Sequence, residues 1–439
     1  MSDKKGEFVM KPIAEYRNRK NLLFTDKDKC DGCASCLKAC PVVSANHIIN
    51  MGNNKKTVQV NNNACIRCGA CLKACDKSAR YYVDDTQKFL DDLDSGKQIS
   101  LIVGPEFALN HPNKYKKVFG WLKKKGISGI YSTVRGEDLL TSIYLDNFTI
   151  ARNLGNSGGR MIASTCPVIV NFVERHVPKA LKYLAPYKSY VVLAAEILRI
   201  QKIEDDFAFL SPCIARSDEF DDNESCIKYN VTIEKLMEQF GMYGDKYVNE
   251  ADFDPVHYMP PFLHRYGIPG SIRENLRICY GDNVFVLNKE GRGNYFSEIP
   301  LFAKDPKFAP NCLDCLNCSN GCLAGTAIGR NSRSIQEIRR DVRVQHLLTP
   351  NPSPNFNMLG ETSILSDSSR KTFFSIQKDF FGQESKININ LFTRKFHDYS
   401  KLGINIDPDI NSRERRDSDR RRRSENTEVQ KENKIERIK

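Results

Sequence analysis

Sixteen cysteines, most of them at short fixed spacings, limit what this chain of 439 residues can fold into more than any other feature. Two blocks repeat the pattern C-x2-C-x2-C-x3-C. The first block is Cys30, Cys33, Cys36 and Cys40, and the second is Cys65, Cys68, Cys71 and Cys75. The N-terminal residues MSDKKG begin no apolar segment of the kind that opens a secretory signal, so we expect a cytoplasmic protein. In that compartment such spacings indicate bound metal rather than disulfides.

The spacing of each block is typical of 4Fe–4S clusters. Three cysteines hold one cubane and the fourth reaches the neighbouring cluster. One cluster is therefore predicted on Cys30, Cys33, Cys36 and Cys75, and a second on Cys65, Cys68, Cys71 and Cys40. Zinc needs only four ligands and rarely shows two such blocks. The segment resembles two-cluster bacterial ferredoxins, which implies an α+β ferredoxin module.

From about residue 98 the pattern changes to short apolar runs that alternate with amphipathic stretches. This alternation predicts an α/β domain with parallel sheets flanked by helices. The apolar segment 190–195 is compatible with either a buried strand or a buried helix. Strands are predicted at 100–104, 130–132, 161–163 and 207–210, and helices over 114–125 and 136–154.

Two further cysteines directly follow predicted strands. Cys166 comes after 161–163, and Cys213 comes after 207–210. Ligands in open parallel sheets bind beyond the carboxyl ends of the strands, so these cysteines are expected to converge there. The C-x3-C pair Cys318 and Cys322 would complete one metal centre. Isolated cysteines are often buried small residues. That simpler interpretation is kept for Cys226 and Cys279.

Three segments, TCPVIVNFVERHVP, LSPCIARSDEF and CSNGCLAG, resemble in their order the signature motifs of the iron-only (FeFe) hydrogenase large-subunit family. The resemblance covers about residues 22–330. It implies an iron-hydrogenase domain with its metal centre at the strand ends. That centre would be an H-cluster, in which a third 4Fe–4S cubane is bridged by one cysteine to a two-iron subsite with cyanide and carbon monoxide ligands. By motif match Cys166, Cys213, Cys318 and Cys322 would hold the cubane, with Cys322 as the bridge.

The sequence departs from this family where protons are handled. Thr165 stands at the position of a proton-carrying cysteine, and Arg216 stands at that of a lysine that contacts a cyanide. A threonine hydroxyl is far too weakly acidic to relay protons as a thiol does. The stretch 141–146 lacks the family's glutamate pair, and 323–326 alters a glycine-rich run. The sensory-type branch also lacks the proton-carrying cysteine, so we expect slow hydrogen chemistry or hydrogen sensing.

Cys312 and Cys315 leave an alternative open. With Cys318 and Cys322 they form a third C-x2-C-x2-C-x3-C block that would bind a cubane by itself. Cys166 and Cys213 would then have no partners. The resemblance to the sensory-type branch includes such extra cysteines, so both are candidates for additional ligands.

Two other functions stay open, a non-catalytic multi-cluster electron carrier and an iron–sulfur assembly-type relative of the hydrogenase fold. For a hydrogenase-type oxidoreductase the expected partners are a redox protein such as ferredoxin and, for the two-iron subsite, hydrogenase maturation proteins. No membrane partner is expected. Nucleic acid is not favoured, because iron-bound thiolates would offset part of the formal charge of +12. The arginine-rich tail also interleaves acidic residues and lacks aromatic ones.

The predicted organisation has five parts. These are a polar lead-in (1–20), the ferredoxin domain (21–85), the hydrogenase-like domain (86–330), a polar extension (331–408) and a charged disordered tail (409–439).

Overall fold

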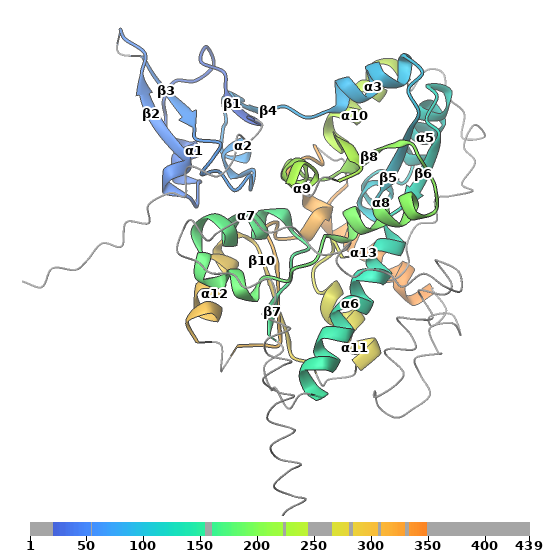
Figure 1. The fold of residues 1–439 in the computed structure, drawn as a ribbon. Coiled ribbons are helices and arrows are strands. Elements are labelled where there is room, and N and C mark those ends of the chain that lie inside the picture. Colours follow the sequence, from blue (N-terminus) through green and yellow to red (C-terminus); the bar gives the residue numbers. More distant parts are fainter. Residues whose placement is uncertain are drawn as a thin grey trace, which may run out of the picture.

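A computed structural model shows the chain from Asn21 onward (Figure 1). The residues it describes are 21–53, 55–153, 160–222, 225–244, 266–280, 284–305, 309–329 and 333–348. The predicted lead-in and tail lie outside these residues, as does most of the extension, and so does the side chain of Cys279. Where the extension is described, it forms helix α13 (Ile335–Leu348).

The N-terminal module is the predicted α+β ferredoxin fold. Two antiparallel strand pairs frame two short helices, and each helix carries the third cysteine of a block. Ala34 and Gly69 precede these helices with left-handed backbones at φ 61° and 71°, which turns each cysteine loop sharply. The elements are β1 (Leu23–Thr25), α1 (Ser35–Lys38), β2 (Asn46–Asn50), β3 (Lys56–Val60), α2 (Ala70–Lys73) and β4 (Arg80–Tyr82).

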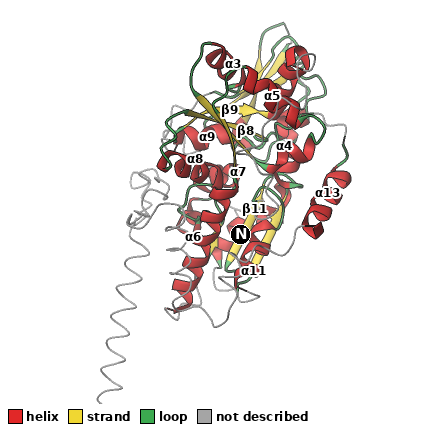
Figure 2. Cartoon of the chain, turned by 90° about the vertical axis from the view of Figure 1, so that its right-hand side faces the viewer, coloured by secondary structure: helices red, strands yellow, loops and turns green. Residues whose placement is uncertain are grey.

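A four-stranded parallel sheet follows, in the order β6-β5-β8-β9. The predicted parallel α/β architecture is confirmed here. Phe207 and Phe209 of β8 pack on the side of α8, while Ala208 and Leu210 pack on the side of α5. Figure 2 shows α8 and α9 on one side of β8 and β9, and α4 and α5 on the other. The strands are β5 (Ile99–Val103), β6 (Gly129–Ser132), β8 (Asp206–Ser211) and β9 (Ile227–Thr232).

Helices cover both faces of this sheet. The segment 190–195, for which strand and helix were equally compatible, lies in a helix. The helices are α3 (Thr86–Asp94), α4 (Pro105–Asn110), α5 (Tyr115–Lys124), α6 (Val134–Asn153), α8 (Tyr190–Ile200), α9 (Arg216–Asp222) and α10 (Ile233–Gln239).

A second parallel sheet has the order β10-β11-β7. Its central strand, β11, includes Cys312 and Cys315, which the sequence pattern had grouped with a cysteine loop. The elements are β7 (Met161–Ile162), α7 (Pro167–His176), α11 (Ser271–Tyr280), β10 (Val286–Glu290), α12 (Arg292–Lys304) and β11 (Cys312–Leu316).

The ferredoxin module shares a hydrophobic core with this second sheet and α7. A buried ion pair also crosses the junction, with Arg67 Nη1 2.8 Å from an oxygen of Asp218 in α9. The His176 ring of α7 lies 3.0 Å from the carbonyl of Ala64. The module is therefore packed against the larger domain rather than tethered to it. No helix among the described residues has the length and hydropathy needed to cross a membrane.

Candidate metal centres

The first predicted set of four cysteines surrounds one cavity. Cys30, Cys33, Cys36 and Cys75 all line it, and its empty volume is about 300 Å³. Three of these residues come from the first block and one from the second, which is the exchange that the spacing predicts. The backbone N–H of Ala79 donates a 3.3 Å hydrogen bond to the Cys75 sulfur, the kind of contact that surrounds cluster sulfurs.

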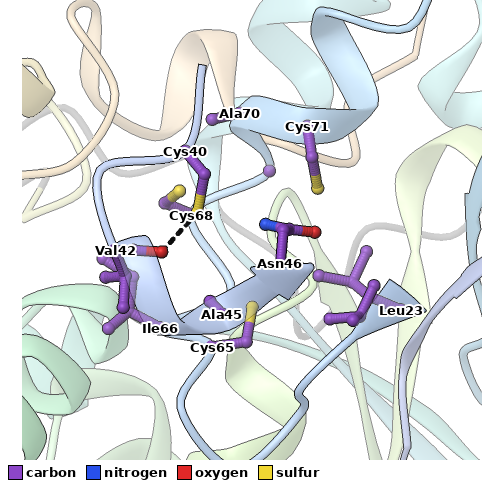
Figure 3. Close-up of a pocket in the computed structure, with 12 residues that line it drawn as sticks. Leu23, Cys40, Val42, Ala45, Asn46, Cys65, Ile66, Cys68, Ala70 and Cys71 are labelled. Atoms are coloured by element: carbon purple, nitrogen blue, oxygen red, sulfur yellow. Dashed lines mark hydrogen bonds between the residues drawn. The ribbon is translucent and has the colours of Figure 1, made fainter. Parts of the chain in front are cut away.

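The second set surrounds a neighbouring cavity of about 310 Å³ (Figure 3). Its four cysteines are Cys40, Cys65, Cys68 and Cys71. The Arg67 N–H lies 3.3 Å from the Cys65 sulfur, while the Cys40 thiol donates to the carbonyl of Val42 at 3.1 Å. Burial raises the pKa of the Cys65 and Cys68 thiols to about 12. Loading a cluster must therefore release protons from these buried thiols.

A buried arginine lies between the two cavities. Arg80 lines the first, and its guanidinium donates to the side-chain oxygen of Asn46, which lines the second. Burial raises the pKa of Cys36 and Cys71, and the positive charge of Arg80 opposes that rise at both thiols. One cation thus acts on a predicted ligand of each ferredoxin cluster.

A third group of cysteines gathers where the strands of both sheets end. Cys166 is the N-cap of α7 after β7, Cys213 follows β8, and Cys318 and Cys322 flank the turn after β11. Burial, together with the nearby Cys213 and Cys166 thiols, raises the pKa of Cys318 to about 12. Burial and the charge of Glu106 are the main causes that raise the pKa of Cys322, and the Cys213 and Cys166 thiols raise it as well. The structure therefore brings these four predicted residues together.

Cys312 and Cys315 behave differently. Both side chains are buried within β11, but Cys312 packs in the core formed by α6 and α8, while Cys315 packs in the core that faces the ferredoxin module. An extended strand directs residues three apart to opposite faces of the sheet. The third block therefore lacks the compact cysteine loop that each of the first two blocks forms. Burial raises the pKa of Cys315 most, followed by the charges of Asp314 and of the Cys166 thiol, which places Cys315 near Cys166.

Within the described ranges, no three Cys, His, Asp or Glu side chains converge closely enough to hold a single metal ion. Each ferredoxin cysteine set surrounds a cavity instead. Four thiols around a space, with backbone N–H groups directed at their sulfurs, are the donors that a 4Fe–4S cubane requires. The residues present therefore fit cubanes in both ferredoxin cavities, and the third group supplies the same four-thiol set.

Buried polar groups surround Cys322. Arg216 at the start of α9 is ion-paired with Glu219 and donates to the Thr165 carbonyl at 3.1 Å. Glu106 also lies close to Cys322, with Gly267 beside both. A Cβ added at Gly267 would be 2.7 Å from the Glu106 Oε1 and 3.1 Å from the Cys322 sulfur. Burial raises the pKa of Glu106.

Three oxygens in this neighbourhood are buried without a hydrogen-bond partner among the described residues. They belong to Glu106, Thr165 and Tyr190, which come from three separate segments. The Arg216 guanidinium lies beside two of these residues, since it contacts the Thr165 carbonyl and lies 5.1 Å from the centre of the Tyr190 ring. Because unsatisfied buried polar groups are costly, their clustering fits an additional polar group next to Cys322.

The residues at the positions of the family's proton relay are buried. Thr165 is 1% exposed, and Ile143 and Tyr144 of α6 are buried in the core beside β7. The Tyr144 hydroxyl accepts a 3.4 Å hydrogen bond from the Ser164 N–H, and burial raises the pKa of that hydroxyl. No carboxylate stands at these positions to continue a relay.

Asn317 connects the second and third groups of cysteines. Its side-chain amide donates to the Cys68 carbonyl at 3.1 Å and lies 3.5 Å from the Cys318 sulfur. The Tyr295 hydroxyl donates to the Asn317 Oδ1 at 3.1 Å and so orients the amide. Sequence reasoning missed Asn317, Glu106 and Arg67. Of these three residues, only Glu106 could have been proposed from the sequence, because it comes after strand β5 as Cys213 comes after β8.

Comparisons with known proteins find a match for each of the two parts of the chain. Residues 22–76 match the model of a 4Fe-4S dicluster domain, and residues 96–285 match that of the iron only hydrogenase large subunit, C-terminal domain. No curated protein matches the chain.

Solved structures of FeFe-hydrogenases share the fold. One, studied for oxygen inactivation of the H cluster 2Fe subcluster, is 14% identical with a TM-score of 0.50. Another, a variant of HydA1 from Chlamydomonas reinhardtii, has the same identity and TM-score. In both cases the match covers 72% of this chain and 99% of the other. The chain thus joins a segment that matches a 4Fe-4S dicluster domain to a domain with the fold and family model of iron-only hydrogenases.

Proposed function

We propose that this protein is an iron–sulfur oxidoreductase of hydrogenase type that relays electrons between two ferredoxin-type 4Fe–4S clusters and a third centre. Cys30, Cys33, Cys36 and Cys75 would hold the first cluster, and Cys65, Cys68, Cys71 and Cys40 the second. Cys166, Cys213, Cys318 and Cys322 would hold the third cubane. At this centre we propose slow hydrogen chemistry or hydrogen sensing, as in the sensory-type branch.

The observation that carries the proposal is the contact made by Asn317. It joins the backbone of Cys68, a predicted ligand of the second cluster, to the sulfur of Cys318, a predicted ligand of the third centre. Electron transfer between metal centres is fast only when the centres lie close together, and a hydrogen-bonded bridge indicates such closeness. The shared core and the buried Arg67–Asp218 ion pair hold the two sides of this junction in a fixed position.

The hydrogen chemistry rests on the surroundings of Cys322. A two-iron subsite bridged by Cys322 would supply the site at which hydrogen and protons interconvert. The unpartnered oxygens of Glu106, Thr165 and Tyr190 fit a polar group of this kind. Arg216 keeps a buried positive charge nearby, which suits anionic ligands such as cyanide.

The slow rate follows from the missing proton relay. Thr165 cannot lose and regain a proton near neutral pH, and Ile143 and Tyr144 provide no acid beyond it. Loss of a positioned acid–base group typically costs about 10²–10⁴-fold in rate. Thr165→Cys alone should raise turnover only modestly, because the residues beyond it still cannot carry protons.

The deciding experiment uses the full chain matured anaerobically with hydrogenase maturation proteins. Infrared bands of cyanide and carbon monoxide, together with hydrogen turnover orders of magnitude below that of catalytic hydrogenases, are expected. Turnover at the catalytic level would contradict slow or sensory function, because protons would then have to reach the site by another route.

The burial of the residues at the proton-relay positions favours a second candidate function, that of a multi-cluster electron carrier without a two-iron subsite. In that case ordered water would satisfy the three unpartnered oxygens. The matured protein would then show cubane signals in electron paramagnetic resonance but no cyanide or carbon monoxide bands.

A further inference from the structure

A large open cleft lies between the ferredoxin module and the second sheet. Its empty volume is about 1320 Å³, and it is lined from one side by α2 and from the other by the start of α12 and the turn after β11. Cys68 and Cys318 both line this cleft. Predicted ligands of two different centres therefore reach the same surface.

The cleft is positively charged. Lys73 and Arg292 line it together with the polar side chains of Asn317, Ser319 and Asn320, and no carboxylate is among its described lining residues. The Arg292 guanidinium donates to the Ala39 carbonyl at 3.1 Å, and the Lys73 ammonium lies 3.5 Å from the carbonyl of Ala324. Both contacts are to neutral backbone groups, which leaves the two charges uncompensated within the cleft.

We propose that this cleft is the docking site of an acidic electron-carrier protein, which exchanges electrons with the second cluster or the third centre without passing through the first cluster. The inference rests on the proposed relay function and adds the surface and the charge of the partner. The step is one electron leaving the reduced carrier and entering a cubane at Cys68 or Cys318, and no bond or proton changes.

A protein fits this cleft better than a small anion for two reasons. The space is far larger than a single phosphate needs, and its walls come from both modules. The two thiolate ligands line it beside the charges, so an acidic surface seated there brings its own metal centre close to both. Opposite charges of this kind chiefly increase the rate of association.

The test measures how fast a reduced, acidic plant-type 2Fe–2S ferredoxin reduces the cluster-loaded full chain. The double variant Lys73→Glu with Arg292→Glu should slow this reaction about tenfold or more, because the steering charge is reversed. Dithionite, a small reductant, should still reduce the variant fully. For the unaltered protein, the ferredoxin rate should fall as salt is added.

The matched control is Lys55→Glu with Lys77→Glu. It changes the net charge equally, and Lys77 lines the first cavity instead. If only this control slows ferredoxin, the carrier docks at the first cluster, and the cleft proposal is overturned while the relay function stands. Equal rates in all variants, or no salt dependence, would overturn it as well. Absence of dithionite-reducible cubanes would instead overturn the relay function itself.

Lys73 and Arg292 also contact the opposite module, so the double variant must retain its iron for the rate to be interpreted. Hydrogen exchange of the unaltered protein gives an independent measurement. Added ferredoxin should protect 292–296 and 317–320. Protection by inorganic phosphate but not by ferredoxin would make the cleft an anion site and overturn the proposal.

Discussion

At the scale of single residues, Asn317 lies where two predicted metal centres meet. Its amide N–H group is directed at the Cys318 sulfur, and such hydrogen bonds stabilise the reduced, more negative state of a cluster. Tyr295 fixes the direction of that amide through its hydroxyl. We therefore expect the side chain to couple the two predicted centres and to adjust the potential of the third.

We predict that Asn317→Asp lowers the reduction potential of the third centre by roughly 60 mV, the one-electron equivalent of ~1.4 kcal/mol. The change removes the donor and adds a negative charge beside the sulfur. Redox titration followed by electron paramagnetic resonance measures the shift. Asn320→Asp, which makes the same chemical change elsewhere in the cleft, should shift the potential less. Equal shifts in the two variants would mean that charge alone, and not the hydrogen bond, is responsible.

At the scale of elements, strand β11 explains why the third cysteine block differs from the first two. Its pairing with β10 and β7 holds Cys312 and Cys315 in an extended strand, on opposite faces. Cys318 and Cys322, which follow the strand, turn toward Cys166 and Cys213, and Cys315 packs in the same core as Cys166.

We therefore expect Cys312→Ala to retain all the iron of the protein, whereas Cys318→Ala should lose about four irons per chain, the content of one cubane. Iron analysis of anaerobically purified protein measures the difference. Cys213→Ala should behave like Cys318→Ala. If Cys312→Ala lost as much iron as Cys318→Ala, the alternative would hold that the third cysteine block binds a cubane by itself.

Strand β11 also buries Asp314, whose pKa is raised to about 7 by burial and by the charge of Glu290, against a hydrogen bond from Asn288. The folded chain therefore holds this proton more tightly than the unfolded chain, where the pKa is near 3.9. This stabilisation is complete below the unfolded pKa and is lost as the pH rises through about 7.

Asp314→Asn should remove that dependence and make the protein more stable than wild type above neutrality. The expected gain is on the order of 1.4 kcal/mol for each unit of pKa shift. Urea denaturation midpoints of the cluster-loaded protein, measured anaerobically near pH 6 and pH 8, provide the comparison. A wild-type midpoint that does not fall between these values would contradict the prediction.

The same strand shows what sequence patterns can and cannot reveal. Cysteine spacing predicted the two ferredoxin cavities because those ligands are local, and apolar runs predicted β5, β6, β7 and β8 because they are uninterrupted. Strand β11 carries an aspartate amid its apolar residues and spaces its cysteines like a ligand loop, so the sequence predicted no strand there. The role of Asn317 could not be predicted from the sequence, because it depends on a contact with Cys68, which is 249 residues away.

At the scale of the whole molecule, the position of the ferredoxin module depends on a buried ion pair. Arg67 and Asp218 are both almost completely buried, with 0% and 4% of their side chains exposed. Asn171 of α7 donates to the same carboxylate at 3.0 Å. Breaking a buried pair by removing one partner typically costs about 3–5 kcal/mol, since the remaining charge stays buried.

We predict that Asp218→Ala weakens docking of the module and slows electron transfer from the second cluster to the third centre, while all clusters stay bound. Rapid mixing with dithionite, followed by freeze-quench resonance spectroscopy, measures that transfer. Asp94→Ala, which removes an exposed ion pair with Lys125, is the matched control and should have no effect. Unchanged transfer in Asp218→Ala would show that the shared core alone fixes the junction.

The loop that carries Arg67 has a consequence for biogenesis. Its cysteines bind the cluster from one side, and its Arg67, Ala64 and Ile66 contact α7 and α9 from the other. An iron-free loop has no metal to shape it, and metal binding contributes folding free energy. Loading of the second cluster is therefore expected to shape the docking face of the module before that face packs against α7 and α9. Under iron starvation, newly made chains would keep an apolar face uncovered and become substrates for cellular proteolysis.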